Sequence, residues 1–145
     1  MSSTAKAIIF GIFSGLVWSL VPGGLNDLFH SKESIFVLVS GALTGVSVSL
    51  ALKVPLTKFS RWWTLAFGLV SLPFGAFIFG VVFSILDFTQ WFSGSQYGFF
   101  TVFLIGGQYA LFSVISLFAV FLFPLAVLTT FLLRAVIHPR EKHLG

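Results

Sequence analysis

Long apolar stretches alternate along the chain with short segments that hold almost all of its charges. A helix needs about 20 apolar residues to cross a bilayer core of about 30 Å. Four stretches of the 145-residue chain reach that length, and they cover residues 7–25, 32–52, 62–86 and 108–133. The pattern predicts an all-α, polytopic integral membrane protein, in which a bundle of four transmembrane helices forms a single transmembrane domain over residues 1–145.

Proline and glycine set the expected helix boundaries. Pro22-Gly23-Gly24 is expected to end or break the first helix, because proline lacks a backbone donor and glycine tolerates unusual backbone angles. Val54-Pro55 is expected to end the second helix, since a residue that precedes proline avoids helical angles.

The last apolar stretch is too long for one simple span. Residues 99–133 would form a helix of about 52 Å, which exceeds the bilayer core by several turns. Gly106-Gly107 either kinks this helix or separates a surface-lying segment from a span that begins near Gln108. We therefore expect residues 88–107 to be an extracytoplasmic or interfacial segment, and residues 134–145 to be a cytoplasmic tail.

The basic residues predict the orientation in the membrane. Seven of the eight Lys and Arg residues lie before the first span, between the second and third spans, or after the fourth span. Short cytoplasmic segments carry an excess of Lys and Arg. Both termini are therefore expected in the cytoplasm, in a multi-pass protein of the cell membrane whose cytoplasmic side contacts anionic lipid headgroups. The seven residues are Lys6, Lys53, Lys58, Arg61, Arg134, Arg140 and Lys142.

Composition excludes several classes of protein. Hydrophobic residues make up 57% of the chain and charged residues only 8%, whereas a soluble domain carries about 25% charged residues. A cytosolic enzyme is therefore excluded. The net charge of +4 does not indicate nucleic-acid binding, since no run of Lys and Arg with interleaved aromatic residues is present. The chain has no cysteine, which excludes disulfides, thiolate nucleophiles and Cys-based zinc sites.

Small and hydroxyl-bearing residues recur at helical spacing in each span. The first and second spans contain the G-x-x-x-G spacings Gly11/Gly15 and Gly41/Gly45. Small residues allow helix backbones to approach closely, which is the main attraction between helices in lipid. We expect these stripes to pack helices together; the alternative is that their hydroxyls line a path for a solute. The predicted packing residues are Gly11, Gly15, Gly41, Thr44, Gly45, Gly68, Ser71 and Gly75.

Ionisable residues are missing from the interior of the predicted spans, where they usually mark proton paths, substrate sites or cofactor ligands. We therefore expect no catalytic residues, no cofactor and no metal. One polar group remains on the predicted outer side: Asp27, His30 and Glu33, with Asp87 at the end of the third span. These residues are either solvated loop residues and helix caps, or a cation or partner site at the outer mouth. Gln108 is expected to be a buried amide that bonds a neighbouring helix.

Two functions compatible with these patterns come from different classes. The first is a non-catalytic membrane protein that acts through helix–helix association, as an accessory subunit of a larger membrane complex or as a homo-oligomer. The alternative is a small passive channel or carrier for a neutral or apolar solute. A third possibility, an enzyme acting on lipid at the interface, lacks a recognisable catalytic pair.

Overall fold

The computed structural model describes residues 2–27, 34–86, 99–116 and 119–138. Within these residues the chain forms the helices α1 (Ser3–Asp27), α2 (Ser34–Lys58), α3 (Trp63–Leu86), α4 (Phe99–Ile115) and α5 (Ala119–Ile137). Four of them, α1, α2, α3 and α5, are long and apolar enough to cross a membrane, and α4 is shorter. The described part of the chain is all-helical, the protein is a multi-pass membrane protein, and the predicted four-helix membrane bundle is confirmed.

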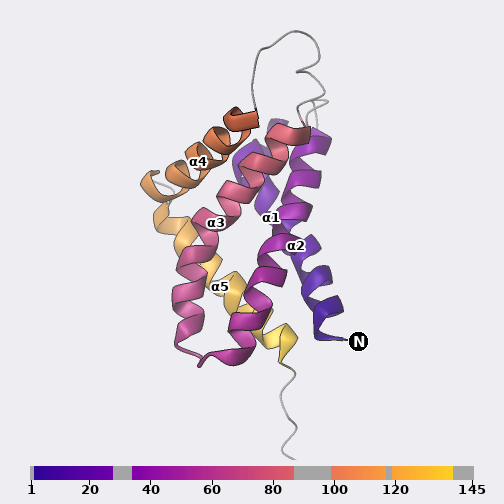
Figure 1. Cartoon of the computed structure of the whole chain (residues 1–145), viewed down its shortest axis with the longest axis vertical. Coiled ribbons are helices and arrows are strands. Elements are labelled where there is room, and N and C mark those ends of the chain that lie inside the picture. The colour runs from indigo at the N-terminus through magenta and orange to yellow at the C-terminus, as the bar shows by residue number, and fades with distance from the viewer. Residues whose placement is uncertain (1, 28–33, 87–98, 117–118, 139–145) are drawn as a thin grey trace, which may run out of the picture.

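The pairwise contacts among the four long helices form a closed ring. Helix α2 lies between α1 and α3, and α5 closes the ring by contacting both α3 and α1. Helix α4 lies outside the ring, where it packs mainly on α3 and only slightly on α5. The beginning of α1 and the end of α5 lie at the same end of the bundle (Figure 1).

Helices α4 and α5 cover successive halves of α3. A Cβ atom built on Gly80, near the end of α3, would lie 2.9 Å from the Cα of Gly106 in α4. A Cβ atom built on Gly68, near the start of α3, would lie 2.7 Å from the Cα of Val127 in α5. The change from α4 to α5 therefore occurs beside the middle of α3 (Figure 1).

The helix boundaries differ from the predictions at the prolines and glycines. Helix α1 continues through residues 22–24 to Asp27, and α2 continues past Pro55 to Lys58. A proline in the last turn removes only one helical hydrogen bond. The following residue, Leu56, is fully buried. Its burial against residues of α1 and α5 holds that turn in place.

The last helical region is interrupted at a different point from the predicted one. Gly106 and Gly107 lie inside α4, where Gly106 packs closely on Phe77 and Val81 of α3. The interruption falls instead between Ile115 and Ala119, so the predicted single helix over residues 108–133 is wrong. Residues 99–107 of the segment expected to lie outside the spans are helical, and residues 88–98 lie outside the described residues.

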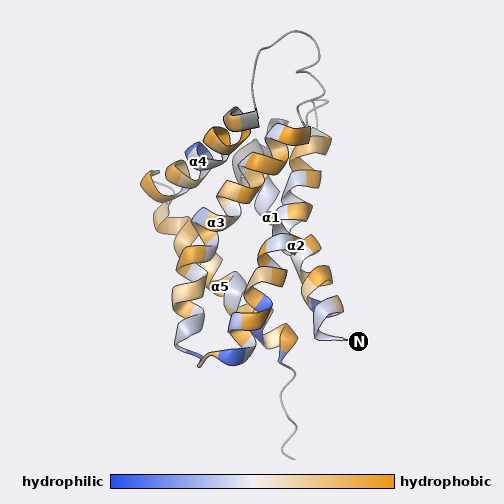
Figure 2. Ribbon diagram, in the orientation of Figure 1, coloured by the Kyte–Doolittle hydropathy of each residue, from blue (hydrophilic) through white to orange (hydrophobic). Residues whose placement is uncertain are grey.

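A buried apolar cluster closes one end of the ring. Ala7, Leu56, Leu133 and Ile137 are almost completely buried there, and they come from α1, α2 and α5. Polar residues gather at the same end of the molecule, as Figure 2 shows. The described basic residues at this end are Lys6, Lys53, Lys58, Arg61 and Arg134.

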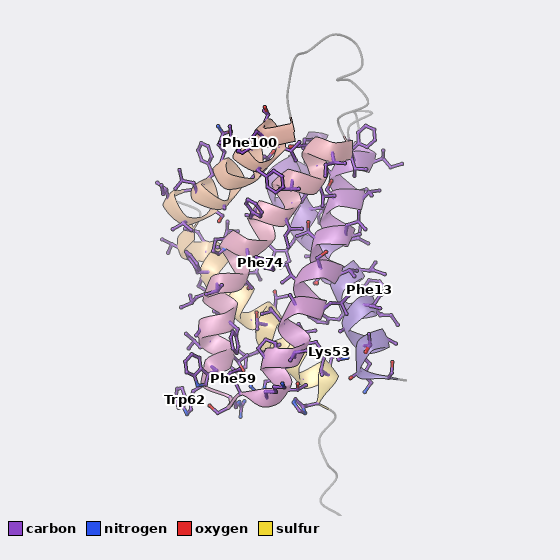
Figure 3. All side chains as sticks on the ribbon, viewed as in Figure 1. Phe13, Lys53, Phe59, Trp62, Phe74 and Phe100 are labelled. Carbon is purple, nitrogen blue, oxygen red and sulfur yellow. The ribbon has the colours of Figure 1, made fainter. Side chains whose placement is uncertain are left out.

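Large apolar side chains cover the outside of the bundle (Figure 3). Phe13 on α1 is 68% exposed and Phe100 on α4 is 82% exposed. Such surfaces are stable only in contact with lipid or another apolar surface, which agrees with the position of these helices in a bilayer.

A candidate binding cavity inside the bundle

The closest helix contact in the ring joins α1 to α2 through four glycines. A Cβ atom on Gly45 would lie 2.7 Å from the Cα of Gly15, and one on Gly41 would lie 2.5 Å from the carbonyl oxygen of Gly15. A Cβ atom on Gly11 would lie 2.7 Å from the Cα of Val46. Any larger side chain at these positions would force the backbones apart. All of these contacts are made within one chain.

The other predicted packing residues lie on two further interfaces. A Cβ atom on Gly75 of α3 would meet Thr44 of α2 at 3.9 Å, an ordinary contact distance. Gly68 contacts α5 closely, through Val127. The Ser71 hydroxyl donates to the carbonyl oxygen of Gly68 at 2.7 Å, within its own helix.

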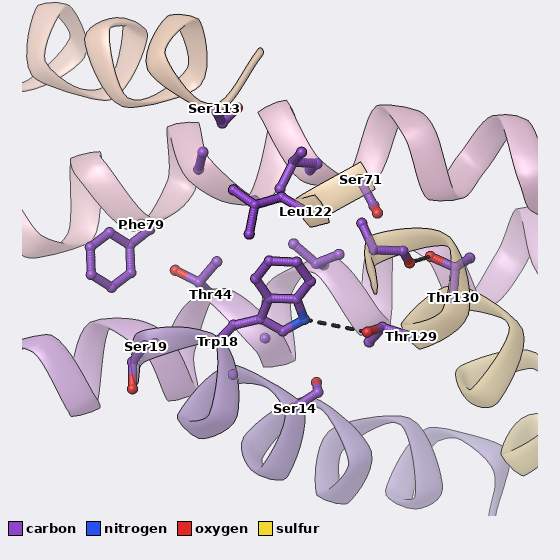
Figure 4. A pocket seen from close by; sticks show the side chains of 18 of the residues that line it. Ser14, Trp18, Ser19, Thr44, Ser71, Phe79, Ser113, Leu122, Thr129 and Thr130 are labelled. Carbon is purple, nitrogen blue, oxygen red and sulfur yellow. Dashed lines mark hydrogen bonds between the residues drawn. The ribbon is translucent and has the colours of Figure 1, made fainter. Parts of the chain in front are cut away.

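These interfaces leave a cavity of about 550 Å³ in the centre of the ring. All five helices contribute to its wall, and Figure 4 shows part of it from close by. Its apolar lining includes the rings of Phe10, Trp18, Phe79, Phe112 and Phe121. Ligand pockets in proteins typically enclose about 300 to 1,000 Å³ and are mainly apolar with a few placed polar groups. The cavity therefore has the size and character of a ligand site.

Hydroxyl groups supply the polar part of the wall. Most of them donate to a carbonyl oxygen one turn earlier in the same helix, as Ser113 does at 2.7 Å and Thr130 at 2.9 Å. A hydroxyl whose proton is used in this way keeps lone pairs that can accept a hydrogen bond. The hydroxyls of this kind that line the cavity are Ser14, Ser19, Ser71, Ser113, Thr129 and Thr130.

Trp18 bridges the cavity from α1 to α5. Its Nε1 donates to Thr129 Oγ1 at 3.4 Å, a long hydrogen bond (Figure 4). The Thr129 hydroxyl in turn donates to the carbonyl oxygen of Leu125 at 2.8 Å. The indole ring lines the cavity, so a molecule bound there would lie close to it, and Trp18 fluorescence can detect its binding.

Two hydroxyls on α2 lack a hydrogen-bond partner. The Oγ of Ser40, a fully buried residue, and the Oγ1 of Thr44 are both buried without one. A buried polar atom without a partner costs about 1 to 3 kcal/mol. Thr44 lines the cavity, so its hydroxyl is a candidate hydrogen-bond partner for a molecule bound there.

The described lining residues include no acidic, basic, His or Cys side chain. A charged ligand would lose its hydration without gaining a partner of opposite charge, at a cost of several kcal/mol. An uncharged molecule that is mainly apolar avoids this cost.

The predicted polar site on the outer side falls mostly outside the described part of the chain. Asp27 is the last residue of α1, and His30, Glu33 and Asp87 are not among the described residues. Gln108 is exposed on α4, so its prediction as a buried amide between helices is wrong. Its turn of α4 packs on α3 through Gly106 and Tyr109 instead. In the described ranges, no three His, Cys, Asp or Glu residues are grouped so that they could hold a metal ion.

Some residues of the cavity wall were predicted from the sequence to pack helices together, but the cavity was not predicted. Thr44, Ser71 and Gly75 are among the predicted packing residues, and all three line the cavity. Phe112 and Phe121 carried no signal, because they are two of 20 phenylalanines. Comparison with family models, curated proteins and solved structures finds no match to the chain. The fold and the cavity define its class: a multi-pass helical membrane protein with a cavity between its helices, whose described lining residues carry no charge.

Proposed function

We propose that the protein is a passive intramembrane carrier that binds an uncharged, mainly apolar molecule in the cavity. The observation that carries this proposal is the 550 Å³ space between the helices, lined by aromatic rings and hydroxyls and free of charged side chains among its described residues. Its described lining residues include no acid–base pair and no nucleophile with a base, so the proposal includes no catalytic step.

We place the closed, basic end of the bundle in the cytoplasm of a cell. Lys6, Lys53 and Arg134 lie at this end, which holds the beginning of α1 and the end of α5. The excess of Lys and Arg on the cytoplasmic side of membrane proteins supports this orientation in the cell membrane, with the basic residues near anionic headgroups.

Quenching of Trp18 tests binding directly. Replacing Trp62, Trp63 and Trp91 by Phe leaves Trp18 as the only tryptophan. We would titrate this variant in nanodiscs with dodecanol that carries bromine on its terminal carbon, since bromine quenches indole on contact. Binding in the cavity predicts saturable quenching. Quenching that rises without saturation, as for a lipid-facing tryptophan, would overturn the proposal.

A matched pair of substitutions on α3 provides the control. Ser71 lines the cavity, whereas its neighbour Val70 is 63% exposed on the outer face. Ser71→Phe fills the space and should lower the apparent affinity at least tenfold, while Val70→Phe should leave it unchanged. Equal effects of the two variants would show that the quencher binds outside the cavity. Circular dichroism and the mass in detergent verify that both variants are folded.

We keep a second proposal, in which the protein acts through helix–helix association as an accessory subunit or homo-oligomer. This proposal concerns a different surface of the protein. The four glycines of α1 and α2 contact one another within the chain, so they do not favour a partner protein. The described face that suits one lies on α4 around Gly107, where no atom lies within 4 Å of a built Cβ atom and Leu104 and Leu111 are exposed. Mass measurement after mild extraction tests this proposal: a single-chain mass contradicts the homo-oligomer.

A further inference from the structure

Two of the described residues that line the cavity are also exposed on the outside of the bundle. Among the described lining residues only Phe112 and Phe121 are exposed, at 72% and 75%. Phe112 lies in the last turn of α4 and Phe121 in the first turn of α5. Both residues therefore lie within one turn of the break between α4 and α5.

This place lies near the middle of the membrane. Gly106 of α4 faces Gly80, and Val127 of α5 faces Gly68. The ends of α4 and α5 fall between these two contacts, beside the middle of α3, which spans Trp63–Leu86. Since α3 crosses the bilayer, its middle lies in the hydrocarbon core. An opening at this depth faces lipid chains and not water.

The opposite route, from the basic end, is closed. Ala7, Leu56, Leu133 and Ile137 fill the ring below the cavity. Lys53 Nζ bonds Thr4 Oγ1 there, which ties α2 to the beginning of α1. A molecule that comes from the water on that side would have to pass this cluster.

The hydrogen-bond capacity of the wall adds a chemical preference. The hydroxyls of Ser71, Ser113 and Thr130 already donate to backbone carbonyl oxygens, so they offer acceptors. A ligand with a hydroxyl of its own can donate to them, whereas an ether or ester of the same length cannot. No described lining residue offers a positive charge to a carboxylate or phosphate.

We propose, resting on the carrier function above, that the cavity takes its ligand sideways from the centre of the bilayer, between Phe112 and Phe121. The ligand is a neutral membrane lipid with a free hydroxyl, of the class of long-chain alcohols. The two phenylalanine rings separate the cavity from the surrounding acyl chains, and the ligand passes when they rotate.

The absence of native cysteine allows a direct test of the opening. In the variant that retains only Trp18, Phe121→Cys is labelled with a bulky, membrane-soluble maleimide. Phe13→Cys, at an equally lipid-facing site on α1 that does not line the cavity, is the matched control. Terminally brominated dodecanol is then added in vesicles, and the rate of Trp18 quenching is followed.

A lateral opening predicts that the label at residue 121 slows quenching at least tenfold, whereas the label at residue 13 does not. An unchanged rate with saturable binding intact would overturn the opening but leave the carrier proposal standing. Loss of saturable quenching in the unlabelled protein would instead contradict the carrier proposal itself.

The source and chemistry of the ligand need two further measurements. Neutral lipids with a free hydroxyl, brominated at the middle of their acyl chains, should quench Trp18, and acrylamide, an uncharged quencher dissolved in the water, should not; the reverse would show access from water. The methyl ether of the brominated alcohol should bind at least fivefold more weakly than the alcohol. Equal binding of the ether and the alcohol would overturn the preference for a hydroxyl donor.

Discussion

Arg134 Nη1, near the end of α5, donates a hydrogen bond to Thr64 Oγ1, in the first turn of α3, at 2.7 Å. The same guanidinium donates to the carbonyl oxygens of Phe59 and Ser60, at 3.0 Å each. Both carbonyls follow the end of α2, where the helix dipole favours a positive charge. One side chain therefore joins α2, α3 and α5 at the closed end of the cavity.

We expect Arg134→Met to destabilise the protein. Thr64 is fully buried, so it would lose its charged partner without gaining water. A hydrogen bond to a charged group contributes about 1.5 to 3 kcal/mol, and part of this is recovered because the Phe59 and Ser60 carbonyls are near the surface. The expected loss is about 1 to 2 kcal/mol, seen as a lower midpoint of thermal unfolding in detergent.

Arg61→Met is the control for this loss. It removes an exposed positive charge from the same end of the bundle, so it should leave the midpoint nearly unchanged. Arg134→Lys should give an intermediate result, since one ammonium group cannot reproduce the fork of a guanidinium. Equal midpoints for Arg134→Met and the unmodified protein would show that the three hydrogen bonds do not stabilise the bundle.

Substitution by alanine should have opposite effects on stability at Gly45 and at Gly107. In Gly45→Ala the new Cβ atom would meet the carbonyl oxygen of Gly11 and lie 2.7 Å from the Cα of Gly15. The helices must separate, which costs about 1 to 3 kcal/mol. In Gly107→Ala the Cβ atom meets nothing within 4 Å. Alanine there should be neutral or stabilise α4 by up to about 1 kcal/mol.

Unfolding of both variants in a denaturing detergent series measures the difference. A lower stability for Gly45→Ala with an unchanged mass in mild detergent would show that the glycines pack within one chain. A lower mass with unchanged single-chain stability would instead place these glycines between two chains, contrary to the contacts of α1 and α2.

The four glycines of α1 and α2 show what a spacing pattern in the sequence can predict and what it cannot. Their spacing of four residues identifies one face on α1 and one on α2, because residues four apart lie on the same side of a helix. It does not identify the partner of each face. That partner is the other helix of the same hairpin, since the four glycines contact one another between α1 and α2 within one chain.

The helix interruption and the cavity were less accessible to prediction. Gly106-Gly107 is the more obvious breaking signal, yet Gly106 stays helical because its lack of a side chain lets α4 lie against α3. The actual end of α4 follows Ile115, and its last residues are ordinary apolar or hydroxyl residues. The cavity depends on where five helices diverge, which no single stretch of sequence contains.

We expect both chain termini on the cytoplasmic side. Single cysteines can be placed in a chain that has none, so Arg61→Cys and Gly94→Cys report the two sides. In intact cells a membrane-impermeant maleimide should label residue 94 and spare residue 61 until the membrane is opened. Labelling of residue 61 alone in intact cells would reverse the orientation and with it the cytoplasmic placement of the basic end.

Transport by the protein should not depend on a pH gradient. A proton-driven carrier needs a group along the path that takes up and releases a proton near neutral pH, and hydroxyls do not. The described lining residues include no carboxyl or imidazole group, so a bound neutral alcohol has no ionisable partner to couple its movement to.

The test uses vesicles that contain the purified protein and are loaded with a fluorescent long-chain alcohol on one side. The alcohol should equilibrate at the same rate with and without an imposed pH gradient. Asp87, which directly follows α3 in the sequence, is the carboxyl group we would test, and Asp87→Asn should leave the rate unaltered. Accumulation above equilibrium that requires the gradient and disappears in Asp87→Asn would replace the passive mechanism by a proton-coupled one.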